Sequence, residues 1–213
     1  MKTAPLIALF AAAALLSACS KESAAPAAPA AAAAPASTST QSSGAAPAPA
    51  AQSSQVSIDT IEKDAQGFQV GPSMAARVVY VFFDPQCPHC SALWYAAKPL
   101  KTQARFVWIP VRLLNDTSET QGAAILAAKE PAEAMDQHEA SLMDHKGGIK
   151  PEGKLDATEA AVKKNTELFT RYQFSSVPTL VTKNAQTGAV VTHEGALPTP
   201  ELAAFLGVPS TEK

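Results

Sequence analysis

RVVYVFFDPQCPHC, residues 77–90, is the stretch that decides the fold. Its first half, residues 77–83, is a continuous run of β-branched and aromatic side chains, which is typical of a strand buried on both faces. Asp84 and Pro85 break that run, and two cysteines follow with two residues between them. We therefore expect the central strand of a sheet to lead directly into a reactive site.

The two cysteines begin a predicted helix over residues 88–100. Free backbone N–H groups and the positive end of the helix dipole favour a thiolate at this position. Pro88 suits a first helical turn because its missing N–H is not needed there, and His89 can donate a hydrogen bond or a positive charge to the Cys87 sulfur. We predict that Cys87 is the nucleophile, that the more buried Cys90 resolves the mixed disulfide, and that Pro88 and His89 tune the pair.

A Cys-x-x-Cys pair has two other interpretations. It can be half of a zinc site, but the sequence offers no second ligand pair at comparable spacing, and His138, His145 and His193 are scattered as on a solvated surface. It can also be a structural disulfide, although the loop that it would close is very short. We favour the redox interpretation and expect neither a metal nor a cofactor.

The remaining elements give the order β-α-β, helices, β-β-α. Residues 105–111 form a second buried strand, which should run parallel to the first because a helix connects the two. Later segments comprise three Ala-rich helices, two strands and a last helix with Thr199 as N-cap, over residues 118–129, 131–145, 158–172, 177–182, 189–193 and 199–206. The fold class is α/β: a thioredoxin-like fold with a helical insertion.

Two further positions are expected beside the cysteine pair. Pro178 opens a strand where the thioredoxin fold places a cis proline, and Val177 before it can then pair with an extended substrate segment. Asp84, three residues before Cys87, can relay protons to Cys90 or cap the turn at the end of the strand. We favour the capping role slightly.

The first quarter of the chain is a different kind of sequence. Residues 1–18 combine a positive start with an apolar run too short to span a bilayer, which matches a secretory signal. The end of that run resembles a bacterial lipobox, which implies that Cys19 is acylated by chains such as palmitate. An ordinary cleaved signal with a chance cysteine is the alternative. Residues 19–54, rich in Ala, Pro and Ser, are a predicted disordered tether, and residues 55–213 hold the folded domain.

The net charge bears on the partners of the protein, and the lipobox bears on its location. The formal net charge is -2, with acidic and basic residues interspersed, which gives no electrostatic case for nucleic acid. Ser20 is not aspartate, and by resemblance to enteric sorting rules this favours the outer membrane over the inner one. We expect a lipid-anchored periplasmic protein whose partners are envelope proteins with thiols or disulfides.

At residues 80–90 and 123–132 the chain resembles the periplasmic thiol:disulfide interchange family of the DsbG and DsbC type. The resemblance covers residues 77–206 and implies a catalytic domain that acts on cysteines of secreted proteins, with a membrane redox partner of the DsbD or DsbB type. Members of this type carry an N-terminal dimerisation domain, whereas residues 55–76 are too few for one, so we expect a monomer. The Pro-His spacer and the valine before Pro178 look more like DsbA, which leaves the redox direction open.

A competing hypothesis belongs to another class of function. The protein could be a lipid-anchored periplasmic chaperone or binding protein that grips unfolded segments near Pro178 and whose thiols are incidental. That hypothesis predicts that Cys87→Ser leaves activity intact. Metal delivery through the cysteine pair is a third, weaker hypothesis.

Overall fold

The computed structural model describes residues 55–210. The predicted signal peptide, the Cys19 anchor and the tether lie outside the described residues. Within residues 55–210, no helix is both long enough and apolar enough to cross a bilayer.

A five-stranded mixed sheet forms the centre of the fold, in the order β1-β3-β2-β4-β5. Its strands are β1 (Phe68–Val70), β2 (Val78–Phe83), β3 (Arg105–Pro110), β4 (Thr179–Lys183) and β5 (Val190–Glu194). As predicted, β2 is the central strand and runs parallel to β3; it pairs antiparallel with β4 on its other side. Alternate β2 side chains are buried in two different apolar clusters, Val81 in one and Phe82 in the other. The central strand is therefore buried on both faces, as its sequence predicted.

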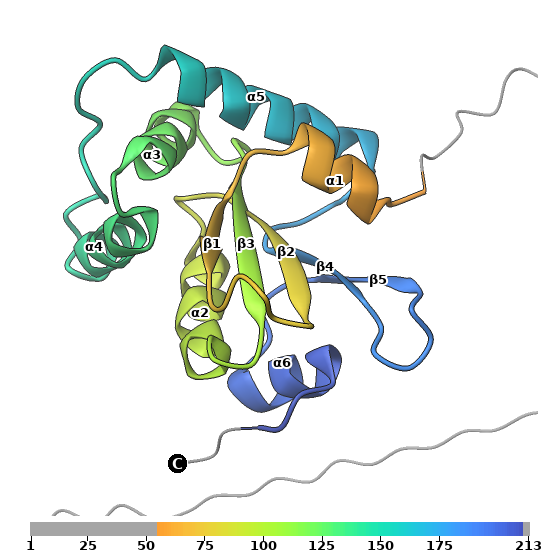
Figure 1. Ribbon diagram of the computed structural model, residues 1–213. Coiled ribbons are helices and arrows are strands. Elements are labelled where there is room, and N and C mark those ends of the chain that lie inside the picture. The colour runs from red at the N-terminus through yellow and green to blue at the C-terminus, as the bar shows by residue number, and fades with distance from the viewer. Residues whose placement is uncertain (1–54, 211–213) are drawn as a thin grey trace, which may run out of the picture. The chain divides into compact units, whose positions relative to one another are not determined.

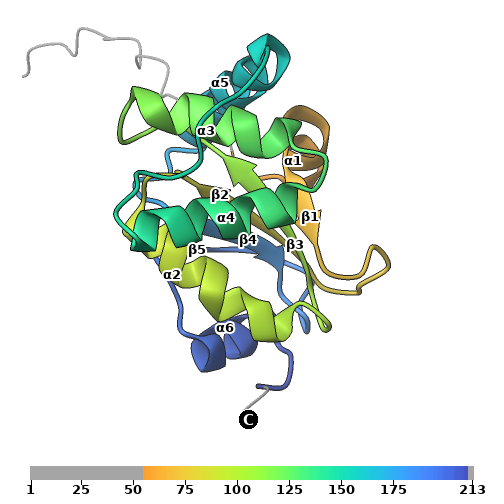
Figure 2. The same ribbon diagram turned by 90° about the vertical axis from the view of Figure 1, so that its left-hand side faces the viewer.

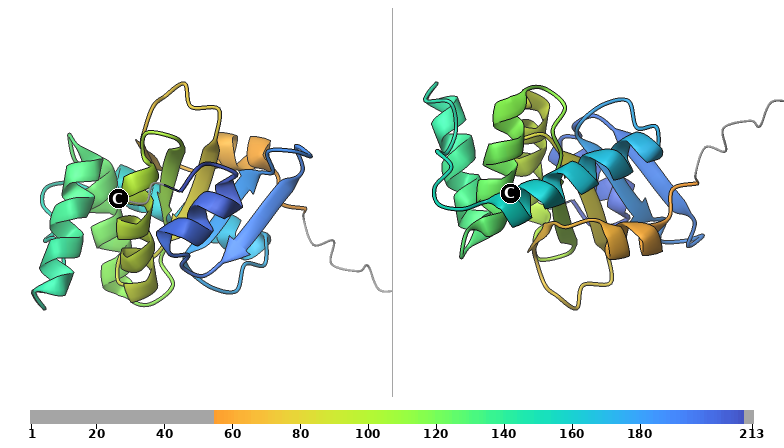
Figure 3. Two further views of the ribbon diagram at one scale, coloured as in Figure 1. Left: turned by 90° about the horizontal axis from the view of Figure 1, so that it is seen from below. Right: turned by 90° about the horizontal axis from the view of Figure 1, so that it is seen from above.

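Helices cover both faces of this sheet, as Figure 1 shows. They are α1 (Ile58–Asp64), α2 (Pro88–Ala97), α3 (Asp116–Ala127), α4 (Pro131–Met143), α5 (Asp156–Arg171) and α6 (Thr199–Leu206), with a 3₁₀ turn, η1 (Lys98–Leu100), after α2. Side chains of α1 and α5 join the cluster of Phe82, whereas those of α2, α4 and α6 join the cluster of Val81. Figure 2 shows α4 between α3 and α2, and Figure 3 shows α5 crossing above the strands.

The predicted helical insertion is confirmed, since α3, α4 and α5 lie between β3 and β4. The prediction of Thr199 as an N-cap is wrong. Pro198 is the N-cap of α6, and the Thr199 hydroxyl donates instead to the carbonyl oxygen of Ala96, 2.9 Å away. That bond uses the hydroxyl to fasten α6 to the end of α2, so the side chain is not available to cap its own helix.

Candidate functional site

The cysteine pair lies where the central strand passes into α2. Cys87 is the N-cap residue of α2, and its carbonyl oxygen accepts hydrogen bonds from the backbone N–H groups of Cys90 and Ser91, at 3.0 and 3.1 Å. The Cys87 side chain is 5% exposed, whereas Cys90 is fully buried. Pro88 and His89, in the first turn, are both exposed. One sulfur thus lies near the surface and the other beneath it.

The two thiols differ strongly in acidity. A hydrogen bond from the Cys90 thiol, with smaller contributions from backbone N–H groups and the nearby His89, lowers the pKa of Cys87 to about 6 despite its burial. Burial, and then the neighbouring Cys87, raise the pKa of Cys90 above its ordinary value. At neutral pH the reduced pair is therefore a thiolate at Cys87 and a thiol at Cys90.

A loop from the far end of the chain closes over Cys87. The Val177–Pro178 peptide bond is cis, as predicted. In the thiol form, the Cys87 sulfur donates to the carbonyl oxygen of Val177 at 3.5 Å. Pro178 is buried, and Val177 packs against both apolar clusters, the only described residue that does so. The structure thus brings both predicted loop residues to the cysteine pair.

Asp84 is fully buried and accepts four hydrogen bonds. Its Oδ1 accepts from the Gln86 backbone N–H at 2.8 Å and from the Ser118 hydroxyl at 2.6 Å. Its Oδ2 accepts from the backbone N–H groups of Leu113 and Leu114, at 2.7 and 2.9 Å. Both oxygens accept from donors of the turn and of the neighbouring loop, so this geometry supports the turn-capping role, and the proton-relay role stays a prediction.

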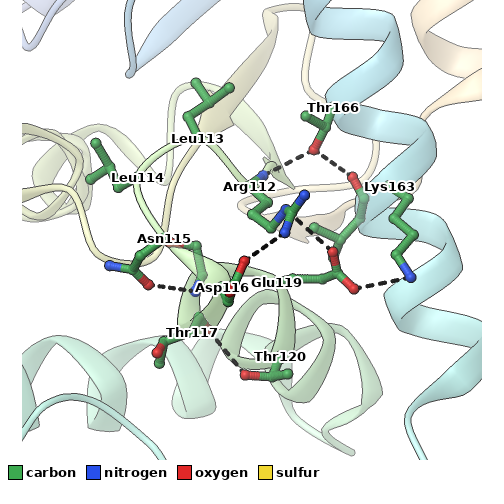
Figure 4. A network of polar contacts seen from close by, with 12 residues as sticks. Arg112, Leu113, Leu114, Asn115, Asp116, Thr117, Glu119, Thr120, Lys163 and Thr166 are labelled. Atoms are coloured by element: carbon green, nitrogen blue, oxygen red, sulfur yellow. Dashed lines mark hydrogen bonds and ion pairs between the residues drawn. The ribbon is translucent and has the colours of Figure 1, made fainter.

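The loop that Asp84 holds presents two exposed leucines, Leu113 and Leu114, 41% and 53% exposed. Figure 4 shows the polar network behind them: Arg112 pairs with Glu119, which also pairs with Lys163, at 3.4 and 3.2 Å. The loop is thus fixed to α3 and α5 on one side and to Asp84 on the other. Its apolar side chains therefore stand in a defined position near the active-site turn.

His138, on α4, contradicts the expectation of a solvated histidine. Its side chain is fully buried, with Nε2 2.7 Å from the carbonyl oxygen of Pro85 and Nδ1 accepting from the Ile149 backbone N–H at 3.2 Å. Since Nδ1 accepts, Nε2 carries the proton and donates to Pro85. Burial lowers the pKa of His138, consistent with a neutral ring. Its position three residues after Met135, on the same helical face, was the available sequence signal.

The neighbouring Glu139 was not predicted at all. It is 1% exposed, and no hydrogen-bond donor reaches its Oε2. Burial, and after it the charge of Cys87, raise the pKa of Glu139 to about 7, while a hydrogen bond with Ser91 acts in the opposite direction. A buried carboxyl group thus lies within electrostatic reach of the Cys87 sulfur.

A family model described as a thioredoxin-like domain matches residues 69–207. The thiol:disulfide interchange protein DsbG of Pseudomonas aeruginosa is 34% identical over 145 residues, which cover 64% of this chain and 54% of that protein. DsbG of Escherichia coli is 41% identical over 75 residues, 33% of this chain and 29% of that protein. The chain thus spans about half the length of the first of these curated relatives and less of the second.

Among solved structures, the catalytic domain of Proteus mirabilis ScsC superimposes with a TM-score of 0.55 at 18% identity. The match covers 70% of this chain and 92% of that domain. At this level of identity the likeness concerns the fold alone.

Proposed function

The chain belongs to the thioredoxin-like domain family, and on that premise we propose that it is a thiol:disulfide oxidoreductase of the bacterial envelope. Cys87 forms the mixed disulfide with protein cysteines and Cys90 resolves it. Pro88 and His89 complete the motif, and His89 favours the thiolate of Cys87 electrostatically. The similarity to two DsbG proteins supports this class of activity.

The observation that carries the proposal is the asymmetry of the pair. A thiolate attacks a disulfide, and a thiol does not. The lowered pKa of Cys87 makes it the attacking sulfur at neutral pH, while the raised pKa of Cys90 keeps that group a buried thiol until a mixed disulfide forms. A disulfide with no redox role requires no such difference between its two thiols.

The exchange follows from this arrangement. The Cys87 thiolate attacks a disulfide sulfur of the substrate, and the substrate's other sulfur leaves as a thiolate. Cys90 then loses its proton and attacks the Cys87 sulfur, so that the Cys87–Cys90 disulfide forms and the bound substrate sulfur leaves as a second thiolate. The same steps in reverse oxidise a substrate dithiol. Stabilising the thiolate stabilises the reduced protein, so it makes the disulfide easier to pass on.

The substrate segment is proposed to lie against Val177 and Pro178, in extended conformation. The carbonyl oxygen of Val177 is 3.5 Å from the Cys87 sulfur, so a backbone bound at Val177 would bring its cysteine to the nucleophile. The exposed Leu113 and Leu114 supply an apolar surface on a loop tied to the same turn. Unfolded or partly folded envelope proteins have the chemistry that such a surface accepts.

The place of action is proposed to be the periplasm, with Cys19 as a lipid anchor and the outer membrane as the favoured site. The likeness to DsbG supports a periplasmic location. A membrane redox partner of the DsbD type would keep the pair reduced, whereas one of the DsbB type would keep it oxidised. Acid trapping followed by alkylation of Cys87 and Cys90 in cells distinguishes the two.

Single cysteine variants of the full chain test the function. Cys87→Ser should lower dithiol-dependent reduction of insulin to the uncatalysed rate, because the attacking sulfur is absent. Cys90→Ser should accumulate mixed disulfides with envelope proteins, because nothing resolves the bond at Cys87. If Cys87→Ser keeps full activity, the oxidoreductase proposal fails and the chaperone hypothesis gains support.

A further inference from the structure

A carboxyl group without a full set of partners is buried where α4 packs against the first turn of α2. Glu139 extends from α4, is 1% exposed, and has no donor at Oε2. Its neighbour on α2 is Ser91, one helical turn after Cys87. A buried, unpaired carboxylate is costly, so such a group is retained at a cost in stability unless it is protonated.

The helix that carries Glu139 is held firmly in place. The Trp94 indole N–H donates to Asp136 at 2.7 Å, and Lys98 pairs with the same carboxylate at 2.6 Å. Two residues further along α4, His138 donates to the carbonyl oxygen of Pro85, two residues before Cys87. The helix segment that carries Glu139 is therefore anchored to α2 and to the turn before it.

We propose that Glu139 takes up a proton when the Cys87–Cys90 disulfide is reduced and gives it back when the disulfide re-forms. The inference rests on the proposed function. The physical reason is that reduction creates a negative charge at Cys87, and a second negative charge on a buried neighbouring carboxylate is then unfavourable. In the disulfide form Cys87 carries no charge, so ionisation of Glu139 is less opposed.

The exchange balances without a proton from solvent. A substrate dithiol brings two electrons and two protons to the oxidised protein. The electrons break the Cys87–Cys90 bond and the substrate's own disulfide forms. One proton goes to Cys90, and the other, which Cys87 does not keep at neutral pH, is divided between Glu139 and the solvent because the pKa of Glu139 is about 7.

The other charged groups around Glu139 do not remove this coupling. Lys98 favours the ionised carboxylate and Asp136 opposes it, and these two groups are paired with each other. His138 directs both ring nitrogens to backbone partners. Burial is the larger cause and the Cys87 charge a smaller one, and together they raise the pKa of Glu139 to about 7, the range in which a proton is exchanged at neutral pH.

The test counts protons. The oxidised full chain is reduced by excess dithiothreitol at pH 7 in weakly buffered solution, and a pH indicator dye reports the protons released. Glu139→Gln should release close to one proton per disulfide, because Cys87 becomes a thiolate. The unsubstituted protein should release roughly half to two thirds as many, and the two should converge above about pH 8, where Glu139 is ionised in both redox states. Glu133→Gln, an exposed position on the same helix, should behave like the unsubstituted protein.

Equal release from the unsubstituted protein and Glu139→Gln at pH 7 would overturn the inference. Glu139→Asp, which keeps an acid in the same place, should restore part of the difference and guards against a variant that merely repacks α4. The proposed function stands or falls separately, on insulin reduction by the Cys87 variant. A protein that shows the proton difference but exchanges no disulfide with protein substrates would retain the coupling and lose the function.

Discussion

At the scale of single residues, the acidity of the Cys87 thiol depends mainly on its contact with Cys90. The first cause of the low pKa at Cys87 is the hydrogen bond from Cys90, ahead of the backbone N–H groups and of His89. The motif alone pointed to His89 as the tuning residue. The buried Cys90 thiol donates to the Cys87 sulfur, so a substitution at Cys90 should change the pKa of Cys87.

Two substitutions at Cys90 distinguish the effect of a hydrogen-bond donor at this position from the effect of the thiol itself. Cys90→Ser keeps a hydroxyl donor, so the pKa of Cys87 should stay near 6, whereas Cys90→Ala should raise it by about one to two units toward 9. His89→Ala should raise it less. The ultraviolet absorbance of the thiolate, followed against pH, gives each midpoint. A larger shift for His89→Ala than for Cys90→Ala would contradict this ranking.

The same shift gives the reduced protein a pH-dependent stability. Because the pKa of Cys87 is lowered on folding, its contribution is present above about pH 9 and is lost as pH falls toward 6. Glu139 has the opposite sign: its pKa is raised on folding, so its contribution is lost as pH rises from about 4.5 to 7. As pH rises, the two buried groups thus change stability in opposite directions between about pH 6 and 7, and above pH 7 only the Cys87 contribution still changes.

Sequence reasoning located the cysteine motif and the cis proline because each has a local signature. It did not find His138 and Glu139. Both lie in an Ala-rich helix whose polar residues look alike in sequence, and only the packing of α4 on α2 separates the buried ones from the exposed Asp136 and Gln137. Their importance depends on a contact between segments about fifty residues apart.

At the scale of elements, strong patterns were predictable and short ones were not. The buried run of β2 and the helix α6 were found, α6 with its bounds. The three-residue edge strand β1 was missed because three residues cannot establish an alternation, and α1 was missed although Ser57 caps it and Ile58 and Ile61 supply a buried face. Both lie between the tether and the first strong strand.

Gly122 in α3 allows a test of how closely that helix packs against its neighbours. A Cβ atom at Gly122 would lie 2.9 Å from Cβ of Pro110 and 3.4 Å from a methyl group of Val162. In an exposed helix, Gly→Ala stabilises by about 1 kcal/mol, whereas overpacking costs about 1–3 kcal/mol. Because the proline ring cannot yield, we expect Gly122→Ala to lower the free energy of unfolding by about 1 kcal/mol, measured with denaturant.

The prediction for Gly122→Ala can be contradicted by the sign of the change in the free energy of unfolding. An increase in stability for Gly122→Ala would mean that α3 can move away from the sheet. Ala124→Gly, two residues further along α3 and less buried, supplies the comparison, since it should lose only the helix propensity of about 1 kcal/mol.

At the scale of the whole molecule, the protein combines a thioredoxin-like domain with an N-terminal segment of quite different composition. The composition of residues 19–54 predicts a tether, and the lipobox predicts its attachment at Cys19. These remain predictions that a fractionation experiment can decide.

Cys19→Ser should move the protein from the membrane fraction to the soluble periplasmic fraction and abolish labelling by a fatty-acid analogue, because no acylated cysteine remains. Ser20→Asp should keep the label and shift the protein toward the inner membrane. Equal membrane association of Cys19→Ser and the unsubstituted chain would rule out the lipid anchor.

Val177 packs against both apolar clusters, although the sheet otherwise keeps them apart. Substitutions in the two clusters are consequently not independent of each other during evolution. A substitution that changes the volume of one cluster reaches the loop that faces Cys87, and a compensating change can arise on the opposite side of the sheet. We therefore expect the loop that carries Val177 to couple the evolutionary histories of the two clusters, which share no other residue in the described part of the chain.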